Sequence, residues 1–146
     1  MRDIDFIVLH TSDSRHGTAT AIRAWHIARG WRDIGYHFVI CNGILTKDLF
    51  LDGMNGAIEY GRPISQIPAS VYGHNHGQIA ICMIGKDGEY TKEQFDSCIG
   101  LIQQLQKIYN IPIGKVIGHY ELDNSKTCPN IDMDKFRTVL TMEKGV

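Results

Sequence analysis

The feature that most constrains the fold of this sequence is the alternation of short, continuously apolar runs with longer segments of helical period. The apolar runs, which predict buried strands, lie at residues 6–9, 36–41, 78–84 and 116–118. The segments with helical period lie at residues 20–30, 91–109 and 132–140. In the first of these segments, Ile22, Trp25 and Ile27 are expected on the buried side. Strands that alternate with helices predict an α/β fold, in which helices cover both faces of a central mixed β-sheet.

Turn and capping signals indicate where several of these elements end. Thr91 and Gln94 have the spacing of a capping box, so a helix is expected to begin there. The dipeptide Asn42-Gly43 tolerates positive φ angles and predicts a type I′ hairpin turn. Residues 52–77 contain five glycines and two prolines without a clear period, which predicts a surface loop with local turns.

Length and charge limit the class of protein. A chain of 146 residues can bury one substantial core, so a single domain is expected over residues 1–146. The formal net charge is −1 and no basic run is present to neutralise phosphates, which argues against a nucleic-acid partner. The first residues lack the pattern of a signal peptide, and no apolar run approaches the ~20 residues that span a bilayer. We therefore expect synthesis in the cytoplasm without a signal peptide, and no membrane insertion.

Three of the four cysteines are predicted to be core residues. Cys41, Cys82 and Cys98 lie in apolar or helical segments, where a thiol behaves as a small hydrophobic side chain. Cys128 differs because it lies in the polar stretch 123–130, which gives it no apolar neighbours. A reduced thiol is expected in the absence of a signal peptide, so Cys128 is a candidate metal ligand or nucleophile.

Two histidines lie at the ends of predicted strands. His10 follows residues 6–9 and His119 follows residues 116–118, and side chains beyond strand ends line the usual ligand crevice of an α/β sheet. Together with Cys128 they form a recognised catalytic zinc set, in which three protein ligands leave the fourth position open. Taken alone, each histidine is better explained as a hydrogen-bonded surface residue. A cysteine-peptidase arrangement of Cys128 and His119 is a further alternative, but it leaves His10 unexplained.

Tyr36 and Lys126 are the polar residues that decide what such a metal could do. Because side chains alternate along a strand, Tyr36 and His37 point to opposite faces, and only one of them can enter the crevice. Lys126 lies two residues before Cys128, close enough in an extended loop to place its ammonium group beside a bound metal. The alternatives are a strand aromatic for Tyr36 and a solvated loop charge for Lys126.

Several separated motifs, taken in order, resemble one known family. They are Val8-Leu9-His10-Thr11-Ser12, Trp25-His26, Arg29-Gly30-Trp31, Asp33-Ile34-Gly35-Tyr36-His37-Phe38, Gly61-Arg62-Pro63, His74-Asn75-His76, Gly118-His119-Tyr120-Glu121 and Lys126-Thr127-Cys128-Pro129. This order resembles the zinc-dependent N-acetylmuramoyl-L-alanine amidases, in particular the single-domain phage endolysins of the T-seven lysozyme kind, which share a fold with the peptidoglycan recognition proteins. The likeness covers residues 6–140.

The resemblance assigns roles to individual residues. It implies one zinc ion, held by His10, His119 and Cys128. It implies that Tyr36 and Lys126 are catalytic polar groups. It also suggests three residues of the substrate groove, namely Arg62, His74 and Asn75.

One segment departs from the family pattern, and one further residue is a candidate for the site. Pro68-Ala69-Ser70 stands where many members have Gly-Ala-His, so a groove histidine is missing and Ser70 or His74 is the candidate substitute. Glu121, close to His119 in the sequence, is a candidate general base or a hydrogen-bond partner of a ligating histidine, and we favour the second role.

The implied reaction is hydrolysis of the amide between the lactyl group of N-acetylmuramic acid and L-alanine in peptidoglycan, with no cofactor beyond zinc. The implied protein is a monomeric phage or prophage endolysin, which reaches the cell wall for host lysis after a holin permeabilises the inner membrane. One alternative is a non-hydrolytic peptidoglycan-binding module, which typically lacks the cysteine ligand that Cys128 provides here. Another is an amidase that also regulates an RNA polymerase.

Overall fold

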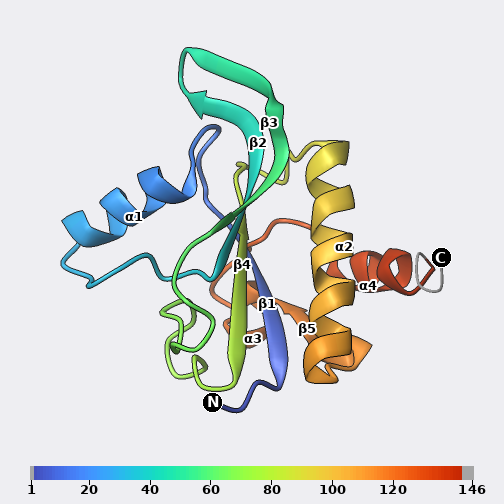
Figure 1. Ribbon diagram of the computed structural model, residues 1–146. Helices are drawn as coiled ribbons and strands as arrows, with labels where there is room; N and C mark the ends of the chain where they lie inside the picture. The colour runs from blue at the N-terminus through green and yellow to red at the C-terminus, as the bar shows by residue number, and fades with distance from the viewer. Residues whose placement is uncertain (1, 143–146) are drawn as a thin grey trace.

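A five-stranded β-sheet forms the centre of the fold in the computed structural model, which describes residues 2–142 (Figure 1). Met1 and residues 143–146, the ends of the predicted domain, lie outside the described residues. The strands are β1 (Phe6–Thr11), β2 (Phe38–Thr46), β3 (Leu49–Tyr60), β4 (Gln78–Met83) and β5 (Val116–Gly118). They lie in the order β3-β2-β4-β1-β5.

The sheet is mixed, as the sequence predicted. β2 and β3 form an antiparallel pair, whereas β4 pairs in parallel with β2 and β1, and β1 pairs in parallel with β5. Parallel neighbours end at the same edge of a sheet, and ligand sites of such sheets usually lie beyond that edge. The carboxyl ends of β1 and β5 therefore lie side by side, so residues at the end of β1, such as His10, can meet residues that follow β5.

Helices cover both faces of the sheet, which confirms the predicted fold class. The helices are α1 (Ala19–Ala28), α2 (Lys92–Tyr109), α3 (His119–Leu122) and α4 (Met133–Met142), with a short 3-10 turn, η1 (Ile113–Lys115). Figure 1 shows α1 on one side of the sheet and α2 with α4 on the other. No helix within residues 2–142 is both long and apolar enough to cross a bilayer.

Two apolar clusters lie between the sheet and these helices. The larger one joins β1, β4 and β5 to α2 and α4, and the smaller one joins β2 and β4 to α1. Cys41, Cys82 and Cys98 are fully buried in these clusters, as predicted, whereas Cys128 is only half-buried. Cys128 is therefore the thiol that stands apart from the cores.

The capping box predicted for α2 is present. The Gln94 amide donates to the Thr91 hydroxyl oxygen over 3.0 Å, and the Thr91 amide donates to the Gln94 side-chain oxygen over 2.9 Å. The Gln94 side-chain nitrogen also donates to the carbonyl groups of Ile40 and Ile84, at 3.0 and 2.8 Å. The same side chain thus starts the helix and ties it to the sheet.

The predicted hairpin turn at Asn42-Gly43 is wrong, because the chain reverses at residues 47–48. β2 continues through Asn42, where the register with β3 shifts on both sides. Gly43 has a φ of +89°, and the Asn42 side-chain oxygen accepts a hydrogen bond from the Ile44 amide over 3.0 Å. The dipeptide therefore serves a β-bulge within the strand, which uses the same backbone freedom as a turn.

The loop predicted for residues 52–77 is shorter than expected. Its first part, up to Tyr60, belongs to β3, and only residues 61–77 connect β3 to β4. Most of β3 is exposed or half-buried, so it shows no continuous apolar run. An edge strand of this kind resembles a loop in sequence.

The buried side of α1 also differs from the prediction. Ala19, Ile22 and His26 face the sheet, whereas Trp25 and Ile27 are 37% and 51% exposed. The spacing of Ala19, Ile22 and His26 is helical, but a histidine is not counted as apolar in such a pattern. The pattern therefore did not predict that His26 points inward, towards the segment that precedes β2.

Candidate metal centre

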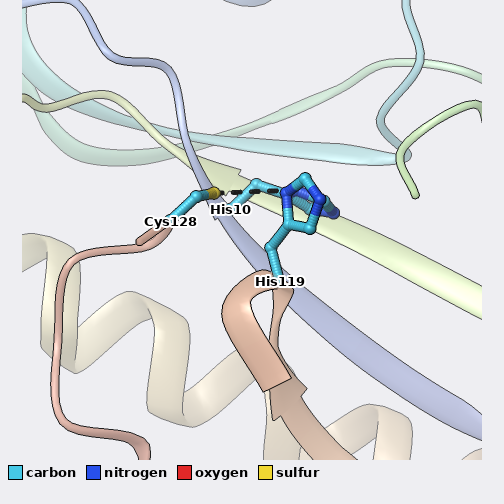
Figure 2. A group of neighbouring side chains, drawn as sticks. All are labelled: His10, His119 and Cys128. Atoms are coloured by element: carbon cyan, nitrogen blue, oxygen red, sulfur yellow. Dashed lines mark hydrogen bonds between the residues drawn. The ribbon is translucent and has the colours of Figure 1, made fainter. Parts of the chain in front are cut away.

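Three predicted metal ligands meet at the carboxyl ends of β1 and β5. Leu9 pairs with Gly118 in the parallel register, so the residues that follow, His10 and His119, are neighbours. Cys128 reaches the same point from the loop after α3 (Figure 2). The candidate ligand atoms of His10, His119 and Cys128 all lie within 4.8 Å of one another.

The distances within this group fit a tetrahedral zinc ion. His10 Nδ1 lies 3.8 Å from Cys128 Sγ, and the two imidazole centres are 4.9 Å apart. Zinc bonds of ~2.0 Å to nitrogen and ~2.3 Å to sulfur at tetrahedral angles place nitrogen and sulfur roughly 3.5 Å apart. Two imidazoles and one thiolate also leave a fourth position open, which is typical of catalytic rather than structural zinc sites.

Burial favours the neutral, metal-binding form of both imidazoles. Burial, followed by the charge of the neighbouring His119, lowers the pKa of His10 to about 3. Burial likewise lowers the pKa of His119. Both rings are therefore neutral at neutral pH, which is the form that binds a metal.

The Cys128 sulfur requires a positive charge if it is to lose its proton. Burial raises the pKa of its thiol to about 11, although the Thr11 amide donates a hydrogen bond to Sγ over 3.1 Å. A divalent cation compensates a buried thiolate and displaces the proton. The Thr11 contact was not predicted, because a backbone donor leaves no side-chain signal in the sequence.

Tyr36 lies against the metal group. Its ring centre is 5.0 Å from that of His10, and burial, followed by the nearby thiols of Cys82 and Cys128, raises the pKa of Tyr36 well above its usual value. The phenol therefore keeps its proton and can donate a hydrogen bond. Tyr36 precedes β2 rather than beginning it, which corrects the predicted strand boundary.

His37 points away from the metal group, so only one residue of this pair enters the site, as predicted. Its Nδ1 accepts a hydrogen bond from the Ala80 amide over 3.0 Å, and its Nε2 lies 2.8 Å from the Gln66 carbonyl oxygen. His37 is buried and holds β4 and the loop beside it rather than facing a ligand.

Lys126 is exposed in the loop that leads to Cys128. Its positive charge acts to lower the pKa values of both His119 and Cys128. The Lys126 amide donates to the Asp123 carbonyl over 3.0 Å, which closes a turn in this loop. Tyr36 thus lies against His10, whereas Lys126 belongs to the loop that carries Cys128.

Glu121 makes contacts other than those predicted. Its Oε1 accepts hydrogen bonds from the Gly118 amide and from Arg137, at 2.9 and 2.8 Å, and its Oε2 accepts from Arg137 at 2.9 Å. These contacts lower the pKa of Glu121, with the Arg137 hydrogen bonds as the main cause. Among residues 2–142, the carboxylate forms no hydrogen bond with His10 or His119. Its visible role is to tie the start of α3 to α4.

Arg62, predicted in the substrate groove, binds backbone carbonyl groups. Its Nε donates to Ile34 over 2.9 Å and one of its terminal nitrogens donates to Ile67 over 2.8 Å. Its own amide donates to the Tyr36 carbonyl over 2.8 Å. Arg62 therefore joins the segment before β2 to the loop after β3.

Asn75 and Ser70 also hold the loop that was expected to contact substrate. The Asn75 side-chain oxygen accepts hydrogen bonds from the amides of Ser70 and Val71, both at 2.9 Å. The Ser70 hydroxyl donates to the side-chain oxygen of Gln78. His74, also predicted in the substrate groove, is exposed, so its ring is accessible.

The fold and these residues define a class of enzyme. Residues 1–131 match the N-acetylmuramoyl-L-alanine amidase family, and the chain belongs to this family. The predicted enzyme class, an amidase, is therefore confirmed.

Particular relatives narrow the comparison. The chain is 29% identical to the endolysin of Escherichia phage T7, over 97% of this chain and 92% of that protein. It is 28% identical to the endolysin of Enterobacteria phage T3, over 92% of this chain and 86% of that protein. The predicted resemblance to phage amidases of this kind is confirmed.

Solved structures agree with the fold. N-acetylmuramoyl-L-alanine amidase LysC from Clostridium intestinale superposes with a TM-score of 0.80 and 27% identity, over 96% of this chain and 87% of that one. Drosophila PGRP-LB superposes with a TM-score of 0.72 over 99% of this chain and 83% of that one, and its 22% identity shows a shared fold.

Proposed function

We propose that this chain hydrolyses the amide between the lactyl group of N-acetylmuramic acid and the L-alanine of the stem peptide in peptidoglycan, with one zinc ion per chain. The observation that carries the proposal is the meeting of His10, His119 and Cys128, whose ligand atoms lie within 4.8 Å of one another in a chain of the amidase family. The peptidoglycan substrate is supported by the name of that family and by the similarity to phage endolysins.

His10, His119 and Cys128 would hold the zinc ion, because they supply two neutral nitrogens and one thiol whose deprotonation a cation favours. When bound, zinc supplies a Lewis acid that polarises a carbonyl group and makes water more acidic. The Thr11 amide orients the Cys128 sulfur by its hydrogen bond.

Tyr36 and Lys126 stabilise the negative charge that develops on the amide carbonyl oxygen. The protonated phenol of Tyr36 can donate one hydrogen bond from the side of His10. The ammonium group of Lys126 can donate charge-assisted hydrogen bonds from the loop before Cys128. Donors aimed at a developing oxyanion are often worth ~10²–10³ in rate each.

We extend the proposal to the biological role of an endolysin. The support is similarity along most of two phage endolysins, of which the chain covers 92% and 86%. In this role the enzyme acts as a monomer during host lysis, and a holin gives it access to the cell wall. Retention of Cys128 supports hydrolysis over binding alone, because a binding module needs no third metal ligand.

Purified peptidoglycan provides the test. We expect the protein to release new N-terminal alanine without new reducing sugar ends, to lose this activity in a metal chelator, and to regain it with added zinc. Alanine end groups and reducing ends are measured on the same digests. Binding to the cell wall without release of alanine would instead identify a binding module, and full activity in chelator would contradict the zinc assignment.

A further inference from the structure

His26 belongs to a sequence motif for which the proposed function gives no role. It lies in α1, is 5% exposed, and faces the sheet together with Ala19 and Ile22. Its imidazole contacts two aromatic rings, with centre distances of 4.4 Å to Trp31 and 5.5 Å to Tyr36. A buried polar side chain in such a position needs a specific partner.

That partner is the backbone just before Tyr36. His26 Nδ1 accepts a hydrogen bond from the Gly35 amide over 2.9 Å. The proton of the neutral ring therefore lies on Nε2. Burial, followed by the charges of Arg29 and Arg62, lowers the pKa of His26 to about 4, so Nδ1 is free to accept at neutral pH.

The segment from Ile34 to Tyr36 is held on its other sides by backbone contacts. The Gly35 carbonyl accepts from the Ala69 amide over 3.0 Å, and the Tyr36 carbonyl accepts from the Arg62 amide over 2.8 Å. A Cβ atom at Gly35 would collide with the Ala69 carbonyl oxygen, so the segment has no room to shift towards that loop. On the side of α1, His26 holds Gly35 by its hydrogen bond, and the Trp31 ring lies close to the same residue.

We propose that His26 is a positioning residue for amide hydrolysis: its hydrogen bond to Gly35 and its contact with the Tyr36 ring fix the phenol beside the metal ligands. The chain of contacts runs from α1 through Gly35 to Tyr36, whose ring lies 5.0 Å from that of His10. This inference rests on the proposed function, in which Tyr36 donates a hydrogen bond to the substrate carbonyl. His26 itself acts only through Tyr36.

The test compares kcat and KM on a soluble muramyl-L-alanyl peptide. Since small displacements of a catalytic group cost up to about 10²-fold in rate, H26L is expected to lower kcat about 10- to 100-fold with KM nearly unchanged. H26N is expected to recover most of this loss, because its side-chain oxygen can take the place of Nδ1. The control is I27A on the exposed side of the same helix, which should behave as wild type. Zinc content and the thermal midpoint of each variant are measured alongside.

A double-mutant cycle with Y36F separates positioning from general destabilisation. If His26 acts through Tyr36, H26L should lower kcat strongly in the wild-type background and hardly at all in Y36F. An equal loss of kcat in both backgrounds overturns the inference. So does an H26L variant of unchanged stability that keeps the wild-type kcat, or an H26N variant of unchanged stability whose kcat is as low as that of H26L. H26N carries the test if H26L does not fold, with its kcat then expected near wild type. Y36F at the wild-type rate overturns both this inference and the proposed role of Tyr36, whereas a wild-type protein that releases no alanine overturns the proposed function itself.

Discussion

Cys128→Ser is expected to lose bound zinc and amidase activity while the protein stays folded. A hydroxyl group replaces the thiolate poorly as a ligand, and His10 and His119 alone leave an incomplete set. The loss of rate should be at least the ~10²–10³-fold that removal of a single oxyanion donor costs. The fold should persist, because Cys128 lies in a loop and is only half-buried, outside both apolar clusters. Bound zinc, clearing of exposed cell walls and the thermal midpoint are measured together.

The matched control is Cys98→Ser, at a fully buried thiol in α2 that is not part of the candidate metal group. It should keep zinc and rate but lose on the order of 1–3 kcal/mol of unfolding free energy, since its hydroxyl is buried without an assured partner. If Cys128→Ser retains stoichiometric zinc and clears cell walls as the wild type does, Cys128 is not a ligand.

Lys126→Ala is expected to keep zinc but to lower kcat by ~10²–10³, because it removes only a donor to the developing oxyanion. Its side chain is exposed and its structural hydrogen bond comes from the backbone amide, so the fold should not change. Steady-state rates on a soluble muramyl peptide and zinc content give the two readouts. Lys115→Ala, at an exposed lysine beyond α2, is the control for loss of a surface charge. An unchanged rate in Lys126→Ala would remove this residue from the mechanism.

Much of the fold is predictable because its strands and helices carry strong periodic signals. The buried strands β1, β4 and β5 are continuous apolar runs, and α2 begins at a capping box that the structure contains. The position of His10 and His119 at strand ends predicted that they could meet, and the parallel pairing of β1 with β5 brings them together.

Features that depend on tertiary partners were not predictable in the same way. Asn42-Gly43 has the sequence of a hairpin turn but forms a β-bulge. The Asn42 side chain donates a hydrogen bond to the Arg15 carbonyl and accepts one from the Ile44 amide. The β3 strand is an exposed edge without an apolar run. The first feature depends on a contact with Arg15, 27 residues away in the sequence, and the second on the position of β3 at the edge of the sheet.

The polar residues of the site show the same limit. The sequence identifies Arg62, Asn75 and Glu121 as polar residues in the right motifs, but not their partners, which prove to be backbone groups and, for Glu121, Arg137. His26 belongs to one of the motifs of the resemblance, but its burial was not predicted, because a histidine does not count in an apolar pattern even though its spacing from Ala19 and Ile22 is helical.

In the proposed function, amide hydrolysis depends on a zinc ion that His10, His119 and Cys128 hold. The most direct measurement is the zinc content of the purified chain, followed during removal by a chelator and reloading, with alanine release recorded at each step. We expect one zinc per chain in the active protein and activity in proportion to the zinc bound. A metal-free protein that releases alanine at the full rate would contradict it.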